Sequence, residues 1–221
     1  MNAKPIETLY NGYRFRSRLE ARWAVFFDAA GIAYQYEPEG YVGYLGIPYL
    51  PDFYLPDLDI YAEVKGTDVQ LRKDAEKICN AIDFNATPIS TGLILLGELP
   101  NADTGQLPIF PLLFWGKGVL YTDCLFDIWN GETSLVRGDQ ENEQSAAYDM
   151  ELSVSGIWEP SCEPSVSVKP RYINTDSLPV CTDPGYINRC YEIARQARFE
   201  YGETPTAAKV RRMALHMWRG R

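Results

Sequence analysis

Hydrophobic and polar positions in the first seventy residues follow two different periods, and each period predicts a type of element. In residues 17–30 the apolar side chains recur at helical spacing and Gly31 is a natural stop, so we expect a helix there. Residues 32–38 alternate as a strand. The stretches 49–56 and 59–66 also alternate, and the short turn between them predicts an antiparallel pair.

Residues 68–84 return to helical spacing, and Asp68 is placed to cap the start of that helix. The continuous apolar run at 91–99 is typical of a strand buried on both faces. The order helix, three strands, helix, strand predicts an α/β sandwich with a mixed central sheet. Two hairpins are also expected, one turning at Asn11-Gly12 and one at residues 116–118.

The second half of the chain has a weaker pattern, which divides the sequence into three parts. From about residue 131 to 183, Ser, Glu, Pro and Asn dominate, and we expect an irregular insert or connection there. It separates a core at 1–130 from a C-terminal part at 184–221. Two basic helices are predicted in this last part, one over 185–202 and one that starts with Thr204 as its cap.

Composition narrows the class of protein. Hydrophobic residues make up 46% of the 221 positions, and 15 Tyr and 5 Trp are too many aromatic residues for a disordered chain. No apolar run is long enough for a signal peptide or a membrane span, so we expect a cytoplasmic protein without a membrane partner. The net charge of −9 excludes a surface that binds nucleic acid throughout, while the basic ends of the chain allow a local one.

The two adjacent strands carry charged residues where apolar ones are usual. Side chains two positions apart share a face of a strand, so Glu63 and Lys65 lie on one face and Val64 lies on the other, the core face. Asp52 on the preceding strand comes close to Glu63, and neighbouring carboxylates repel each other unless a cation neutralises them. Mg²⁺ accepts a site of two carboxylates, the Val64 carbonyl and waters. Lys65 then supplies positive charge for a reacting phosphate, which suits phosphodiester hydrolysis.

Pro51-Asp52 followed by Glu63-Val64-Lys65 resembles the motif of the PD-(D/E)XK nuclease superfamily, and the upstream helix with Glu20 resembles the helix that carries its first conserved acid. The stretches YEPEG, YLPDF and EVKG look most like compact phage and mobile-element members, which include junction resolvases and transposon end-cleaving subunits. The resemblance covers roughly residues 13–97.

This resemblance implies a restriction-endonuclease-like fold with a C-terminal helical extension, and an activity that depends on Mg²⁺, for which Mn²⁺ substitutes. It makes Asp52 and Glu63 metal ligands, Lys65 the catalytic lysine, and Glu20 a further ligand or a water-positioning acid.

Several of these residues have a structural alternative. Ser17 and Glu20 fit a capping box, in which Glu20 reaches back to the helix start instead of toward a metal. Glu37 and Glu39 either extend the acidic cluster or belong to a polar turn, and Glu37 is favoured because it directly ends a strand.

Glu63 and Lys65 have a simpler alternative as well, an ion pair on an edge strand that stabilises the fold little. The basic residues are likewise either phosphate contacts or ordinary solvated surface. The candidates for nucleic-acid binding are Arg14, Arg16, Arg18, Arg195, Arg198, Arg211 and Arg212.

The sequence therefore predicts a metal-dependent endonuclease of phage or mobile-element origin that hydrolyses phosphodiester bonds in duplex or branched DNA. The alternative is a catalytically inactive nuclease fold that binds nucleic acid or inhibits a host protein. The net charge of −9 supports this alternative, because an acidic protein can mimic DNA. An RNA or single-strand nuclease and a homodimer both remain open.

Overall fold

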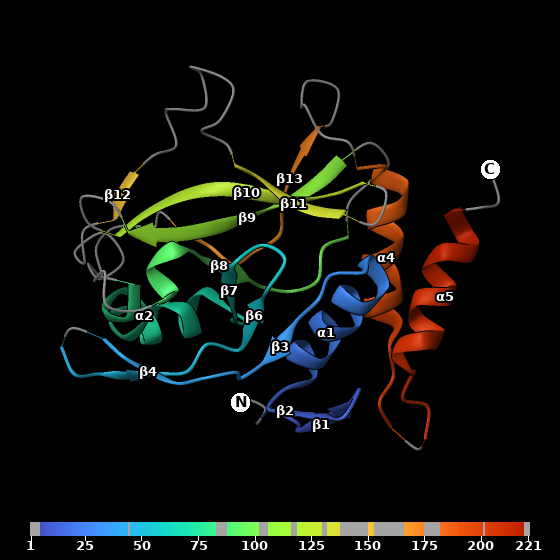
Figure 1. Cartoon of the computed structure of the whole chain (residues 1–221), viewed down its shortest axis with the longest axis horizontal. Helices are drawn as coiled ribbons and strands as arrows, with labels where there is room; N and C mark the ends of the chain where they lie inside the picture. The colour runs from blue at the N-terminus through green and yellow to red at the C-terminus, as the bar shows by residue number, and fades with distance from the viewer. Residues whose placement is uncertain are drawn as a thin grey trace.

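A mixed β-sheet forms the centre of the computed structural model, and helices cover both of its faces (Figure 1). The structure describes residues 5–43, 45–82, 88–101, 106–115, 119–129, 132–137, 150–152, 166–174, 182–200 and 202–218. For the central sheet, the predicted order of helix, three strands, helix and strand is present as α1 (Arg18–Ala30), β3 (Gln35–Tyr36), β6 (Phe53–Leu55), β7 (Ile60–Val64), α2 (Asp68–Ile82) and β8 (Leu93–Leu96). Between β3 and β6 the chain also forms a separate two-stranded sheet, β4 (Tyr41–Val42) and β5 (Pro48–Tyr49). The mixed α/β class is therefore confirmed.

The strands of the central sheet lie in the order β11-β10-β9-β8-β7-β6-β3, with β12 beside β10 and β13 beside β9. The strands not yet named are β9 (Gln106–Trp115), β10 (Val119–Trp129), β11 (Glu132–Arg137), β12 (Met150–Leu152) and β13 (Arg171–Asn174). β7 and β8 pair in parallel, and the other pairs are antiparallel. A parallel pair needs a crossover connection, which here contains α2 and the 3-10 helix η1 (Pro88–Thr91).

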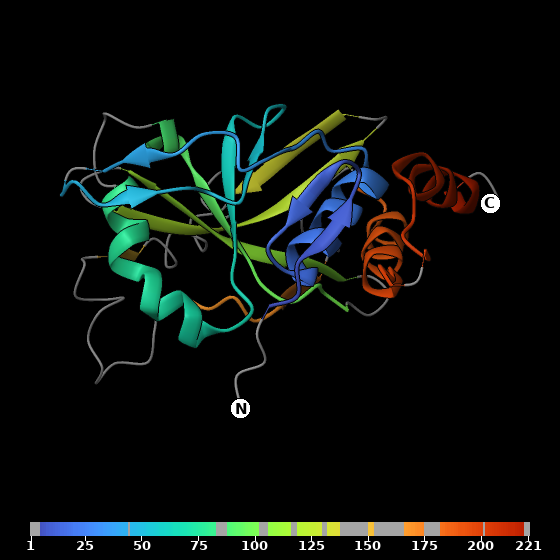
Figure 2. The ribbon, with the colours of Figure 1, turned by 90° about the horizontal axis from the view of Figure 1, so that it is seen from below.

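Alternate side chains of the inner strands enter two separate cores, one on each face of the sheet. On one face, Ile60, Ala62 and Val64 of β7 share a core with α1 and with the C-terminal helices α4 (Pro184–Gln196) and α5 (Ala207–Trp218). On the other face, Tyr61 shares a core with α2. Figure 1 shows α1, α4 and α5 side by side, and Figure 2 shows α2 well apart from them. The predicted core face of β7 is confirmed, and the C-terminal helices pack against α1.

Local sequence signals place the N-terminal elements where they are expected. The hairpin strands are β1 (Thr8–Tyr10) and β2 (Tyr13–Phe15). They join through Asn11 and Gly12, whose φ angles of 48° and 85° are those of a type I′ turn. Ser17 caps the start of α1 with its side chain, and Gly31 ends the helix in the left-handed conformation with a φ of 79°.

The described residues between 131 and 183, which we expect from sequence to be an irregular insert, contain strands β11, β12 and β13. They extend the central sheet by pairing with β9 and β10. β13 pairs with β9, which lies far upstream, and a pairing between distant segments leaves no turn signal in the local sequence. The division of the chain at 130 and 183 stays a prediction, and the expected turn at 116–118 lies outside the described residues.

The ends of the C-terminal helices also differ from the prediction. α4 ends at Gln196, and the extended backbone of Ala197 takes the chain away from the helix axis. Phe199 then packs edge-on against the ring of Tyr10, with 6.2 Å between the ring centroids. α5 starts two residues later than expected, because the Thr206 hydroxyl accepts a hydrogen bond from the Lys209 N–H at 3.3 Å and takes the capping role.

The start of α2 is fixed by two polar residues. Thr67 caps the helix, since its hydroxyl accepts a hydrogen bond from the Gln70 N–H at 3.2 Å, so the predicted cap at Asp68 is wrong. The Asp68 carboxylate instead accepts hydrogen bonds from the Ser167 hydroxyl and the Val168 N–H, each at 2.9 Å. We call residues 166–169 the strap, because they tie this helix end to a distant part of the chain.

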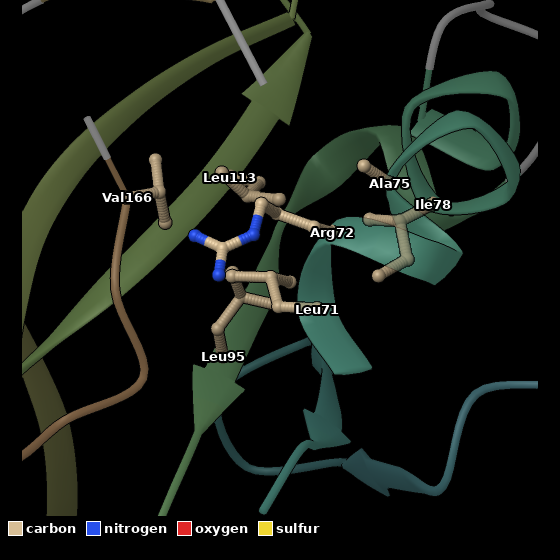
Figure 3. Close-up of a pocket in the computed structure, with 7 residues that line it drawn as sticks. All are labelled: Leu71, Arg72, Ala75, Ile78, Leu95, Leu113 and Val166. Atoms are coloured by element: carbon tan, nitrogen blue, oxygen red, sulfur yellow. The ribbon is translucent and has the colours of Figure 1, made fainter. Parts of the chain in front are cut away.

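A small apolar pocket lies where α2 meets the sheet and the strap (Figure 3). It is lined by Leu71, Arg72, Ala75, Ile78, Leu95, Leu113 and Val166. Its lining holds no acid, and Arg72 is its one charged residue, with its guanidinium drawn close to the aliphatic side chains. We therefore regard the pocket as a packing gap of this core.

Candidate active site

Asp52, which directly precedes β6, lies opposite Glu63 of β7 when the register of this strand pair is continued by one residue. β6 and β7 pair with Phe53 opposite Ala62, so one residue further along the same register Asp52 stands opposite Glu63. Both acids face the α2 side of the sheet, because they alternate with two residues of the α1 core. Their exposed fractions are 8% and 4%. The sheet therefore brings two buried carboxylates together, as the sequence pattern indicates.

The Val64 backbone joins this site from the same side. Its N–H donates to Oδ2 of Asp52 at 2.8 Å, so the peptide edge of Val64 points toward the β6 side. In an antiparallel ladder the N–H and C=O of one residue point to the same neighbouring strand. The register places Pro51 opposite Val64, and a proline has no N–H to donate to the Val64 carbonyl. This carbonyl is therefore suited to another ligand.

Lys65 follows directly on β7, and its ammonium contacts two carboxylates. Nζ lies 2.6 Å from Oε1 of Glu63 and 2.6 Å from Oδ2 of Asp74 on α2. The other oxygen of Glu63 accepts a hydrogen bond from the Tyr49 hydroxyl at 2.6 Å, and Tyr49 belongs to β5 (Pro48–Tyr49), which pairs with β4 (Tyr41–Val42). Glu63 is thus held on both oxygens.

Electrostatics single out Asp52. Burial, and after it the charges of Glu63 and Glu20, raise the pKa of Asp52 well above its usual range, while the Val64 N–H and Lys65 oppose this with smaller effects. Burial lowers the pKa of Lys65, but Glu63 and Asp74 outweigh it and raise that pKa above its usual value. The site therefore has more negative charge than its own lysine neutralises.

Glu20 is held at the start of α1. Its Oε1 accepts from the Ser17 hydroxyl at 2.6 Å, and its Oε2 accepts from the Arg16 N–H at 3.0 Å and the Tyr36 hydroxyl at 2.7 Å. The reciprocal bond from the Glu20 N–H to the Ser17 hydroxyl completes a capping arrangement. Glu20 is nevertheless close enough to Asp52 for its charge to raise the pKa of that residue.

Glu37 lies next to Asp52 through the backbone, since its N–H donates to the Asp52 carbonyl at 2.9 Å. Its carboxylate is directed elsewhere and pairs with Arg16, whose Nε lies 2.7 Å from Oε1. Glu39 is exposed. The structure therefore brings the backbone of Glu37, but not its charge, to the acid pair.

Most of the candidate nucleic-acid-binding arginines contact acceptors within the chain. These contacts are Arg14–Glu7, Arg16–Glu37, Arg18–Glu200, Arg195 to the Pro100 carbonyl, Arg198–Glu203 and Arg211–Asp28. Arg212 is exposed on α5. Arg16 and Arg18 are near Glu20 in the sequence, because they flank Ser17, the residue that caps α1.

Within the described ranges, no three His, Cys, Asp or Glu side chains are grouped closely enough to hold a metal ion by themselves. The acids at the site are the pair Asp52 and Glu63, with Glu20 turned back to the helix start. Sequence reasoning missed Tyr49 and Asp74, which contact Glu63 and Lys65. The sequence gives a weak signal for Asp74, because it is an acid about two turns into the helix that directly follows Lys65. It gives no such signal for Tyr49, which reaches Glu63 only because the β4–β5 ribbon folds next to β7.

No family model, no curated protein and no solved structure compared with this chain gives a match. Among the described helices, none is both long and apolar enough to cross a membrane.

Proposed function

We propose that this chain is a metal-dependent endonuclease with a PD-(D/E)XK type of site, which hydrolyses phosphodiester bonds in DNA. One observation carries the proposal: Asp52, just before β6, and Glu63, on the adjacent strand β7, are two buried carboxylates in opposite register, and Lys65 directly follows β7. The surrounding mixed sheet with helices on both faces is compatible with a restriction-endonuclease-like fold.

The donor set fits a divalent cation. Asp52 uses Oδ2 for the Val64 N–H, which leaves Oδ1 for a metal, and the Val64 carbonyl points toward the same strand. A carboxylate has about four lone-pair positions, so Glu63 can bind a cation while it keeps its hydrogen-bond donors. The raised pKa of Asp52 also supports a cation site, because it means that the negative charge of the buried Asp52 is not fully compensated by nearby positive charge. Oxygen donors of this kind suit Mg²⁺, with Mn²⁺ as a substitute.

When bound, such a metal makes a coordinated water more acidic and neutralises charge on a phosphate. Asp52, Glu63 and the Val64 carbonyl would hold it, and the tyrosine at 49 would keep the Glu63 carboxylate oriented. The Lys65 ammonium, which contacts Glu63 and is partly exposed, would stabilise negative charge that develops on the phosphate oxygens and orient the attacking water. Glu20 acts on the site through its charge near Asp52.

The second candidate is a nuclease fold without catalysis, which binds nucleic acid or inhibits a host protein. The pairing of Arg14, Arg16 and Arg18 with acids supports it, because paired arginines are less available to phosphates. The net charge of −9 points the same way.

A cleavage assay separates the two functions. Wild-type protein and the variants Lys65→Ala and Asp52→Ala are incubated with supercoiled plasmid, linear duplex, branched junctions, single strands and RNA, in Mg²⁺ or Mn²⁺. We expect both variants to lose at least about 100-fold in rate, while Lys73→Ala, an exposed lysine on α2, keeps wild-type activity. Near-wild-type rates in both site variants would refute the proposal. Tight binding without cleavage of any substrate would favour the second candidate.

A further inference from the structure

Lys65 has two carboxylate partners that differ in their surroundings. The side chain of Glu63 is 5% exposed and lies inside the site, whereas that of Asp74 is 41% exposed and lies at its edge. Lys65 itself is 15% exposed and bridges the two, with 2.6 Å between Nζ and an oxygen of each acid. The lysine is therefore anchored between an interior acid and a helix.

These two anchors respond differently to a cation bound at Asp52 and Glu63. Glu63 would then share its negative charge with the cation, and the cation would repel the nearby ammonium of Lys65. The attraction of Glu63 for Lys65 would therefore weaken at the stage where catalysis needs the lysine in place. Asp74 pairs with Lys65 from α2 and lies outside the proposed donor set, so its attraction for Lys65 would persist.

α2 gives Asp74 a fixed position. The helix begins with the Thr67 cap, and the Asp68 carboxylate is bonded to Ser167 and Val168 of the strap. Side chains on a packed helix are held more accurately than those on loops. Asp74 lies nearly two turns into this helix, where fraying of the helix end has little effect.

We propose that Asp74 is a positioning residue for Lys65, which keeps the ammonium aimed at the reacting phosphate once Glu63 is engaged by the metal. This inference rests on the proposed function. It extends the site from two strands to a helix, and it assigns α2 a part in catalysis that the strand motif does not contain.

The test compares Asp74→Asn with Glu76→Gln, which removes the same charge from an exposed position of the same helix. We expect kcat of D74N to fall about 10- to 100-fold, as misplaced catalytic groups do, while KM for DNA changes less than about twofold. Glu76→Gln should match the wild type, and Asp74→Glu should recover part of the loss. In calorimetric titration with Mg²⁺ alone, D74N should bind the metal within about twofold of the wild-type Kd, because Asp74 pairs with Lys65 and is not a metal donor, and a loss of Mg²⁺ binding would overturn the inference. In a Lys65→Ala background, Asp74→Asn should have no further effect, because the two residues act as a unit.

The outcomes are distinguishable from failure of the proposed function. If wild-type protein cleaves DNA but D74N and E76Q behave alike, the inference is wrong and the proposed function stands. A rise in KM at constant kcat, or a loss that is fully retained in the Lys65→Ala background, would also overturn it. If wild-type protein cleaves no nucleic acid with Mg²⁺ or Mn²⁺, both the proposed function and this inference fail.

Discussion

Replacing Asp52 by Asn should make the metal-free protein more stable at neutral pH. Asp52 is buried beside Glu63 and within reach of the charge of Glu20, and its pKa is raised well above the usual range. Asn removes the negative charge but retains an oxygen that accepts the hydrogen bond from the Val64 N–H. The substitution therefore removes a repulsion while it preserves the local backbone contact.

The direction in which stability changes with pH follows from proton linkage. Because the folded pKa of Asp52 is raised, the folded protein binds this proton more tightly than the unfolded chain does. Its stabilising contribution is complete below the unfolded pKa of about 3.9 and is lost as the pH rises toward the folded pKa. Between these two values, the free energy of unfolding of the wild type should fall relative to Asp52→Asn by about 1.4 kcal/mol for each pH unit.

Urea unfolding at a series of pH values in EDTA, followed by tryptophan fluorescence, to which the buried Trp23 contributes, measures this difference. A pH-independent gap between the two proteins would show that Asp52 is not destabilised as the structure implies. Mg²⁺ should shift this difference in favour of the wild type, since a metal present at 100 times its Kd stabilises the wild type by about 2.7 kcal/mol. Equal stabilisation of both proteins by Mg²⁺ would place the metal elsewhere.

Three further substitutions test individual contacts by urea or thermal unfolding. Tyr49→Phe removes the buried hydroxyl that donates to Glu63, and should cost about 1–3 kcal/mol. Gly97→Ala would bring a Cβ within 1.7 Å of the strap backbone, so we expect a loss of about 1–3 kcal/mol and faster proteolysis at the strap. Arg211→Ala deprives the buried Asp28 of a cation 3.4 Å away, and should cost about 0.5–1 kcal/mol because the arginine is largely exposed.

Each of these has a matched control. Tyr54→Phe removes a hydroxyl whose bond to Asp59 is solvent-exposed, and should change stability by less than about 0.5 kcal/mol. Gly40→Ala places a Cβ at an ordinary contact distance of 3.7 Å and should be tolerated. Arg212→Ala removes an exposed guanidinium and should have little effect. A loss in any control as large as in its partner would contradict the contact assigned to that pair.

Sequence alone predicts those parts of the fold that short-range signals determine. Asn11-Gly12 and Gly31 adopt the positive φ values that their residue types favour, so the first hairpin and the end of α1 follow directly. The same reasoning failed at helix starts where two polar candidates lie close together. Thr67 rather than Asp68 caps α2 because Asp68 has partners a hundred residues away, and no local rule reveals them.

The residues of the candidate site also fall into those set by short-range signals and those set by long-range packing. Asp52, Glu63 and Lys65 follow from period two and a short turn, because the β6–β7 register is set locally. Asp74 and Tyr49 are contributed by a helix and a ribbon whose placement depends on packing against the sheet. The capping role of Glu20 is present, and its charge also raises the pKa of Asp52, while its role as a metal ligand or a water-positioning acid stays a prediction.

Because the strap anchors α2, completion of the site depends on the order in which the chain is synthesised. Val168 follows Asp68 by 100 positions, so at 5–20 residues per second a growing chain waits about 5–20 s between making the start of α2 and making its anchor. During that time Asp52, Glu63 and Lys65 are already present, but the helix that carries Asp74 lacks its tie. Under the proposed function, a growing chain that lacks the strap would be a poor nuclease, and its activity would mature only after the strap is made.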